Sequence, residues 1–186
     1  MAKIGKALSV IALIFGMSGV LIGGFALIQL NFTGDQPTHY VLPMARVYLD
    51  SSYNLNGVEY QRLNYTHKSF DSHDAFNLAT DEYIVPETGF YQVVAQYSVE
   101  AYDQDLFIIS IFNNMYLNGT CAYTVSISTF TWYFSVAITD IITAFEGDAI
   151  SINTFLFLSG PPTRALFPGE HYTYFSIVKI NNIYNF

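Results

Sequence analysis

The chain has 186 residues, of which 52% are hydrophobic and 17% aromatic, and its formal net charge is −8. Lys3 and Lys6 lie at the extreme N-terminus, so residues 31–186 carry 5 basic against 15 acidic side chains, a net charge of −10. Such an acidic region excludes nucleic-acid binding through basic contacts to phosphates. The abundance of Tyr and Phe favours β-structure.

Residues 8–30 are uncharged and contain only three polar side chains. As a helix they would extend about 35 Å, enough to span a bilayer. The positive-inside rule places residues 1–7 in the cytoplasm and the C-terminal part outside the cell membrane. We predict a single-pass signal anchor. Two alternatives stay open, namely secretion after cleavage near Gly24-Phe25-Ala26 and pilin-type processing near Leu8.

Gly19 and Gly23 form a GxxxG spacing within this segment. Small residues at this spacing permit close approach of two helices, so they are candidates for helix association. Residues 31–45 contain Pro37 and Pro43 and are predicted to be a short tether.

Residues 46–186 alternate between short apolar runs and turn residues, which predicts an all-β sandwich. Asn118-Gly119 predicts a two-residue hairpin turn, because both residues tolerate positive φ. The predicted strands are residues 46–52, 58–65, 75–78, 82–85, 90–99, 106–117, 121–127, 132–145, 149–158 and 171–181.

Side-chain alternation assigns faces to two of these strands. In residues 90–99 the core face carries Tyr91, Val93, Ala95, Tyr97 and Val99. The other face carries Phe90, Gln92, Val94 and Gln96, and in residues 149–158 the corresponding face carries Ser151, Asn153 and Phe155. Such a mixture of apolar and amide side chains suits a subunit interface.

Four blocks follow one another along residues 83–178. They are the Val-Pro-x-x-Gly-x-Tyr motif of residues 83–91, the strand and Asn-Gly pair of residues 109–120, the Gly-Asp turn of residues 144–152 and the closing strand of residues 174–178. In this order they resemble the globular head shared by complement C1q and the tumour necrosis factor superfamily. Ile177 departs from the pattern, since the family usually has Gly there.

The resemblance implies a jelly-roll β-sandwich that forms homotrimers. It also implies that the strands of Phe90 and Phe155 belong to one inner sheet near the threefold axis. The candidate trimer interface is therefore Phe90, Gln92, Val94, Gln96, Ser151, Asn153 and Phe155. The implied function is an outward-facing recognition or ligand module that binds an extracellular protein or glycan.

Three minor sites have simpler alternatives. Asn64 is the candidate for glycosylation among three sequons, because Asn31 is close to the predicted span and Asn118 lies in the predicted turn. Asp103 and Asp105 could bind calcium, although a plain polar turn is the favoured interpretation. The cluster of His and Asp residues at positions 67–74 is interpreted as a solvated loop, because it lacks the spacing of a metal site.

No sequence motif of a hydrolase, metalloprotease or phosphate-binding loop is present. Cys121 is the only cysteine, which excludes an intrachain disulfide and leaves a buried thiol or an intermolecular bridge. We therefore expect a protein that is not an enzyme and has no cofactor. A structural subunit of a surface assembly or filament is the alternative, and an anchored hydrolase is a third hypothesis.

Overall fold

A computed structural model describes residues 41–126 and 131–182. The predicted span at residues 8–30, with Gly19 and Gly23, lies outside these residues, as does Asn31. Within the described ranges, no helix has the length and apolar character needed to cross a membrane.

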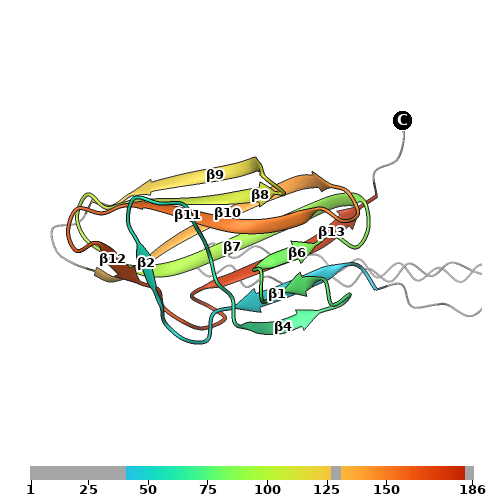
Figure 1. Cartoon of the computed structure of the whole chain (residues 1–186), viewed down its shortest axis with the longest axis horizontal. Helices are drawn as coiled ribbons and strands as arrows, with labels where there is room; N and C mark the ends of the chain where they lie inside the picture. The colour runs from blue at the N-terminus through green and yellow to red at the C-terminus, as the bar shows by residue number, and fades with distance from the viewer. Residues whose placement is uncertain (1–40, 127–130, 183–186) are drawn as a thin grey trace, which may run out of the picture. The chain divides into compact units, whose positions relative to one another are not determined.

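The described residues form two facing β-sheets and a small third sheet (Figure 1). The first sheet has five strands in the order β10-β7-β13-β1-β4, and the second has six, with β5-β6-β11-β8-β9 along its path and β3 paired to β11. The third pairs β12 with β2. The strands are β1 (Met44–Tyr48), β2 (Asn54–Asn56), β3 (Gln61–Arg62), β4 (His67–Asp71), β5 (Phe76–Asn77), β6 (Glu82–Ile84), β7 (Gly89–Ala101), β8 (Leu106–Asn113), β9 (Tyr116–Thr124), β10 (Thr131–Ala144), β11 (Ala149–Phe157), β12 (Thr163–Ala165) and β13 (Tyr174–Asn181).

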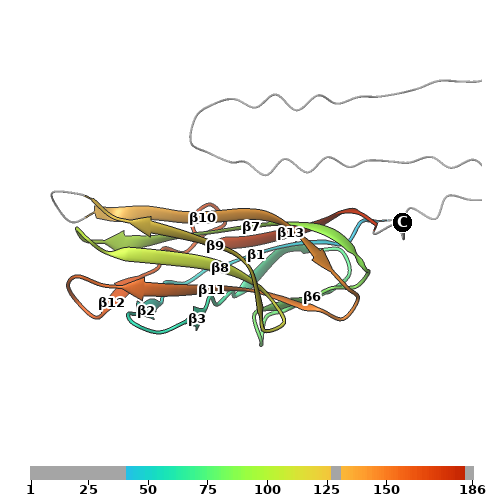
Figure 2. The ribbon, with the colours of Figure 1, turned by 90° about the horizontal axis from the view of Figure 1, so that it is seen from above.

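The two large sheets pack face to face around an aromatic-rich core (Figure 2). Tyr97 on β7 contacts Phe107 on β8 with ring centroids 6.5 Å apart, and Tyr83 on β6 contacts Tyr91 on β7 at 6.2 Å. Each pair joins a strand of one sheet to a strand of the other. The predicted all-β sandwich is therefore confirmed, and its core is filled by large rings that bury much apolar area per residue.

Strand β7 follows the predicted alternation. Its inward side chains, Tyr91, Val93, Ala95, Tyr97 and Val99, are all fully buried. Phe90 and Gln92 are exposed on the other side, and Val94 and Gln96 are half-buried there. The period-2 pattern predicted these faces because one side of the strand must pack on the opposing sheet.

Strand β13 lies in the centre of the five-stranded sheet, between β1 and β7. It pairs antiparallel with both, so that Val178 faces Met44 on one side and Gln92 on the other. The first and last strands of the sandwich are therefore neighbours, and residues far apart in the sequence complete one sheet.

The predicted turn at Asn118-Gly119 is wrong. The β8–β9 hairpin turns at Asn114-Met115, where Asn114 has a φ of 53°. Asn118 instead lies inside β9 at a bulge, because Ile111 pairs with Gly119 and Phe112 with Leu117. Asn tolerates positive φ as Gly does, so Asn114 can occupy the turn without a glycine.

The interpretation of residues 67–74 as a solvated loop is also wrong in part. Residues His67–Asp71 form β4, the edge strand beside β1. The predicted strand at residues 58–65 shrinks to Gln61–Arg62, while β2 and β12 were not predicted. Strand β1 begins at Met44, so its first two residues lie within the predicted tether of residues 31–45. An edge strand such as β4 has few apolar side chains, so its sequence does not show the alternation of apolar and polar residues that predicts a strand.

Candidate interaction surfaces

The outward side of the five-stranded sheet presents a surface that we call the five-strand face. Gln92 of β7 lies between Ile141 of β10 and Val178 of β13, and Val94 lies between Thr139 and Ser176. Phe90 and Ile141 are 36% and 58% exposed. From Phe90 to Gln96 and at the paired positions, the described side chains that point outward include no charged group.

Arg46 of β1 borders the five-strand face. Its guanidinium lies 4.1 Å from the centre of the Tyr174 ring and donates a 2.8 Å hydrogen bond to the Glu170 carbonyl. The cation–π contact and the hydrogen bond hold this charge flat against the sheet. The face beyond it is therefore apolar and amide-rich within an acidic domain.

The expectation that β7 and β11 share one inner sheet is wrong. Strand β7 belongs to the five-stranded sheet and β11 to the six-stranded sheet, so their outward side chains emerge on opposite sides of the sandwich. Phe90, Gln92, Val94 and Gln96 thus lie together, whereas Ser151, Asn153 and Phe155 do not join them. Alternation along a strand predicts its two faces but not the sheet to which it belongs.

The outward side of β11 instead carries an aromatic group. The Phe155 ring lies 4.9 Å from the Tyr60 ring and 4.9 Å from the Phe157 ring. Phe157 is 51% exposed, while Ser151 is buried. The buried Asn153 Oδ1 has no hydrogen-bond partner. This second surface lies on the side of the sandwich away from the five-strand face.

Asp105 forms a buried ion pair. Arg164 donates to both of its carboxylate oxygens, from Nε at 2.7 Å and Nη2 at 2.9 Å, and both side chains are fully buried. The N–H groups of Tyr102 and Ser159 donate to the same carboxylate. Burial alone would raise the pKa of Asp105, but the Arg164 guanidinium and these donors outweigh it and hold the pKa below its usual range.

Calcium binding at Asp103 and Asp105 stays a prediction, and the structure places the two carboxylates in different environments. Asp103 is exposed, while both oxygens of Asp105 are occupied by Arg164. Over residues 41–126 and 131–182, no three His, Cys, Asp or Glu side chains are placed so that they could hold a metal ion.

The acidic and basic side chains of residues 67–74 pair with one another beside an open groove of about 810 Å³. Lys68 Nζ lies 2.9 Å from Asp71 and 2.6 Å from Asp74. Asp71 also accepts hydrogen bonds from the N–H groups of Ala75 and Phe76, which ties β4 to the edge of the opposite sheet. These contacts explain the cluster as a brace between the two sheets.

The remaining candidates occupy different places. Asn64 is exposed, and its backbone N–H donates to the Tyr53 hydroxyl. Cys121 is half-buried on β9, where it packs on the core beside Tyr123. Sequence reasoning missed Ile141 and Val178 as members of the five-strand face, although the alternation of residues 132–145 would have placed Ile141 on it.

The sequence matches no family model and no curated protein. Among solved structures, Eiger TNF from S. frugiperda superposes with a TM-score of 0.60 at 12% identity, covering 77% of this chain and 96% of that chain. The globular domain of zebrafish complement 1qA superposes with a TM-score of 0.56 at 15% identity, covering 77% of this chain and all of that domain.

These likenesses and the strand order agree on one architecture. At such low identity they establish fold and nothing finer. The described region is therefore a jelly-roll β-sandwich that is similar in fold to Eiger TNF and to the zebrafish complement 1qA globular domain.

Proposed function

We propose that the chain is a membrane-anchored, outward-facing homotrimeric recognition module that binds an extracellular protein or glycan. The observation that carries the proposal is the five-strand face, an uncharged surface on a region with a net charge of −10. The cores of protein interfaces are depleted in charge and contain aromatic side chains. A second copy of this chain is therefore a suitable occupant.

The residues of the face suit self-association in a further way. Phe90, Ile141 and Val178 offer apolar area, while Gln92 and Gln96 offer amide groups that can donate and accept. Gln96 already donates to the His171 carbonyl at 3.0 Å, which orients its amide. Oriented amides beside apolar groups allow an interface that is partly hydrated yet specific. The residues Ser151, Asn153 and Phe155 are not part of this proposed interface.

Membrane anchoring is supported by the sequence of residues 8–30. The segment carries no charge, and Lys3 and Lys6 lie on its N-terminal side. This arrangement favours a cytoplasmic N-terminus and an external jelly roll. Glycosylation of Asn64 would be compatible with that location, because the side chain is exposed.

A surface-assembly or filament subunit is the second candidate. The aromatic group of Tyr60, Phe155 and Phe157 favours it, because an open filament needs two different contact surfaces on each protomer. Mass spectrometry of the native N-terminus separates the candidates. An intact segment through Leu30 supports the anchored trimer, and a chain that starts near Leu8 supports a processed filament subunit.

The oligomeric mass of the full chain in detergent, measured by native mass spectrometry, tests the trimer. We expect a trimer for the unmodified chain, a monomer for Ile141→Arg and a trimer for Phe157→Arg. The two replaced side chains are matched, at 58% and 51% exposed, and lie on opposite outer faces. A monomeric unmodified chain, or dissociation by Phe157→Arg alone, would overturn the proposed interface.

A further inference from the structure

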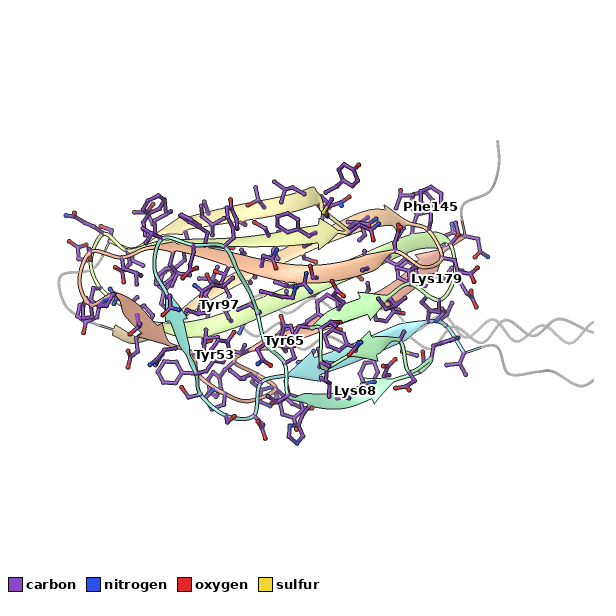
Figure 3. The ribbon with its side chains drawn as sticks, in the orientation of Figure 1. Tyr53, Tyr65, Lys68, Tyr97, Phe145 and Lys179 are labelled. Carbon is purple, nitrogen blue, oxygen red and sulfur yellow. The ribbon has the colours of Figure 1, made fainter. Side chains whose placement is uncertain are left out.

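One end of the sandwich carries a group of exposed apolar side chains, at the end where β1 begins and β13 ends. Met115 is 89% exposed and Tyr116 77% exposed at the β8–β9 turn, and Phe145 is 58% exposed at the β10–β11 turn. Val41 and Ile180 complete the group. We call these five residues the tip cluster. Figure 3 labels Phe145 and Lys179, which both belong to this end of the sandwich.

The two turns that carry the tip cluster are joined by hydrogen bonds. Asp148 accepts from the side-chain amides of Asn113 and Asn114, each at 2.9 Å, and from the Phe145 N–H at 2.9 Å. The Ala149 N–H donates to the Asn114 side chain. These hydrogen bonds therefore fasten the turn of Met115 and Tyr116 to the turn of Phe145.

Two described turns at the opposite end, residues 102–104 and 159–162, have a different composition. They are rich in Asp, Gln, Ser, Gly and Pro, and neither carries a large exposed apolar side chain. Single exposed apolar residues are common on protein surfaces, but several gathered at one end indicate a contact.

We propose that the tip cluster inserts into the interfacial layer of the same bilayer that holds residues 8–30, an inference that rests on the anchor in the proposed function. The chain enters the jelly roll at Val41 at this end, and ten residues, 31–40, separate Val41 from Leu30. Even when fully extended, ten residues span at most about 35 Å. With residues 8–30 in a bilayer, as proposed, this length sets an upper limit on the distance between Val41 and the lipid surface.

The chemistry of the tip cluster suits a zwitterionic lipid surface. Tyr and other amphipathic side chains favour the boundary between headgroups and acyl chains. Two carboxylates at this end already have partners within the protein. Glu87 forms an ion pair with Lys179 at 2.7 Å, and Asp148 accepts hydrogen bonds from Asn113 and Asn114. Glu146 stays exposed beside Phe145 and disfavours anionic lipids.

Tryptophan quenching by brominated phosphatidylcholine tests the inference in the full chain. Met115→Trp, Phe145→Trp and Val58→Trp are each made in a Trp132→Phe background, because Trp132 is the only tryptophan. Val58 is a matched control, at 72% exposed and hydrogen-bonded through its N–H to Leu156, toward the far end of β11. We expect at least two-fold quenching at positions 115 and 145 and none at 58.

The outcomes separate this inference from the anchor. If the chain stays with vesicles after carbonate washing but positions 115 and 145 are unquenched, the anchor stands and tip insertion is overturned. Equal quenching at position 58 also overturns it, because contact would not be specific to this end. Release of the chain by carbonate overturns both the anchor and the inference.

Discussion

The two ends of the sandwich are stabilised by opposite means. The end formed by the β7–β8 and β11–β12 connections buries a charge pair, Asp105 with Arg164, and leaves polar turns in solvent. The end formed by the β8–β9 and β10–β11 turns is braced by hydrogen bonds to the partly exposed Asp148 and leaves apolar side chains in solvent. The comparison shows that a fully buried ion pair and a hydrogen-bonded, partly exposed carboxylate can each fasten two connections at one end of a sandwich.

Replacing Asp105 by Ala should be the most damaging change at either end. It leaves the fully buried Arg164 guanidinium without its carboxylate, which costs about 3–5 kcal/mol of unfolding free energy. Denaturant unfolding measures the loss. The double variant Asp105→Ala/Arg164→Met should be more stable than the single variant, because no uncompensated charge remains. Equal stability of the two variants would contradict a role for the ion pair.

Gly89→Ala should have the next largest effect, at the end that carries the tip cluster. A Cβ at position 89 would lie 2.5 Å from the Asn181 carbonyl oxygen and 2.6 Å from Lys179 Cε. Overpacking of this kind costs about 1–3 kcal/mol. Gly160→Ala at the opposite end is the control, because its Cβ would meet atoms no closer than 3.8 Å. Equal denaturation midpoints for both variants would refute the packing argument.

Acid should weaken the braced end through Asp148. Burial would raise its pKa, but the Phe145 N–H and the amides of Asn113 and Asn114 outweigh it and hold the pKa below the ordinary 3.8. A lowered pKa stabilises the fold above pH 3.8, and this contribution is lost as the pH falls through the folded-state value. The stability difference between the unmodified chain and Asp148→Asn should shrink below pH 3.8. If the difference in unfolding free energy between the two proteins did not change with pH, Asp148 would not be the group that makes the fold sensitive to acid.

Met115→Ser should have the smallest effect on folding. The side chain is 89% exposed and contributes little to packing, so unfolding free energy should change by less than about 0.5 kcal/mol. The same variant in the full chain should lower protection of the Tyr116 amide from hydrogen exchange in phosphatidylcholine vesicles. A large loss of stability would mean that Met115 belongs to the fold and is not free to contact lipid.

The sequence predicted features that depend on local alternation. The inward set from Tyr91 to Val99 was correct because a half-buried strand imposes a period of two. The sandwich class and its resemblance to tumour necrosis factor and C1q were also correct. Gly89 of the Val-Pro-x-x-Gly-x-Tyr motif now has a physical reason, which is the close approach of Asn181 and Lys179.

Features that depend on distant pairing could not be predicted. The sheet that contains β11 is set by its pairing with β8 and β6, which alternation within residues 149–158 does not encode. Asp105 and Arg164 are 59 positions apart, so the calcium hypothesis could not foresee that the carboxylate was occupied. Strand β4 was missed because His67–Asp71 has few apolar residues and is ordered through β1.

The central place of β13 also constrains when the jelly roll can form during synthesis. Strand β13 pairs with β1 on one side and with β7 on the other. Until residues 174–181 have left the ribosome, β1 and β7 each lack this partner. The five-stranded sheet can therefore be completed only after β13 has been synthesised. Until then, the side of β1 that pairs with β13 is an unpaired strand edge. Nascent chains stalled before Tyr174 should accordingly depend on chaperones, and deletion of this one strand should leave two separated half-sheets.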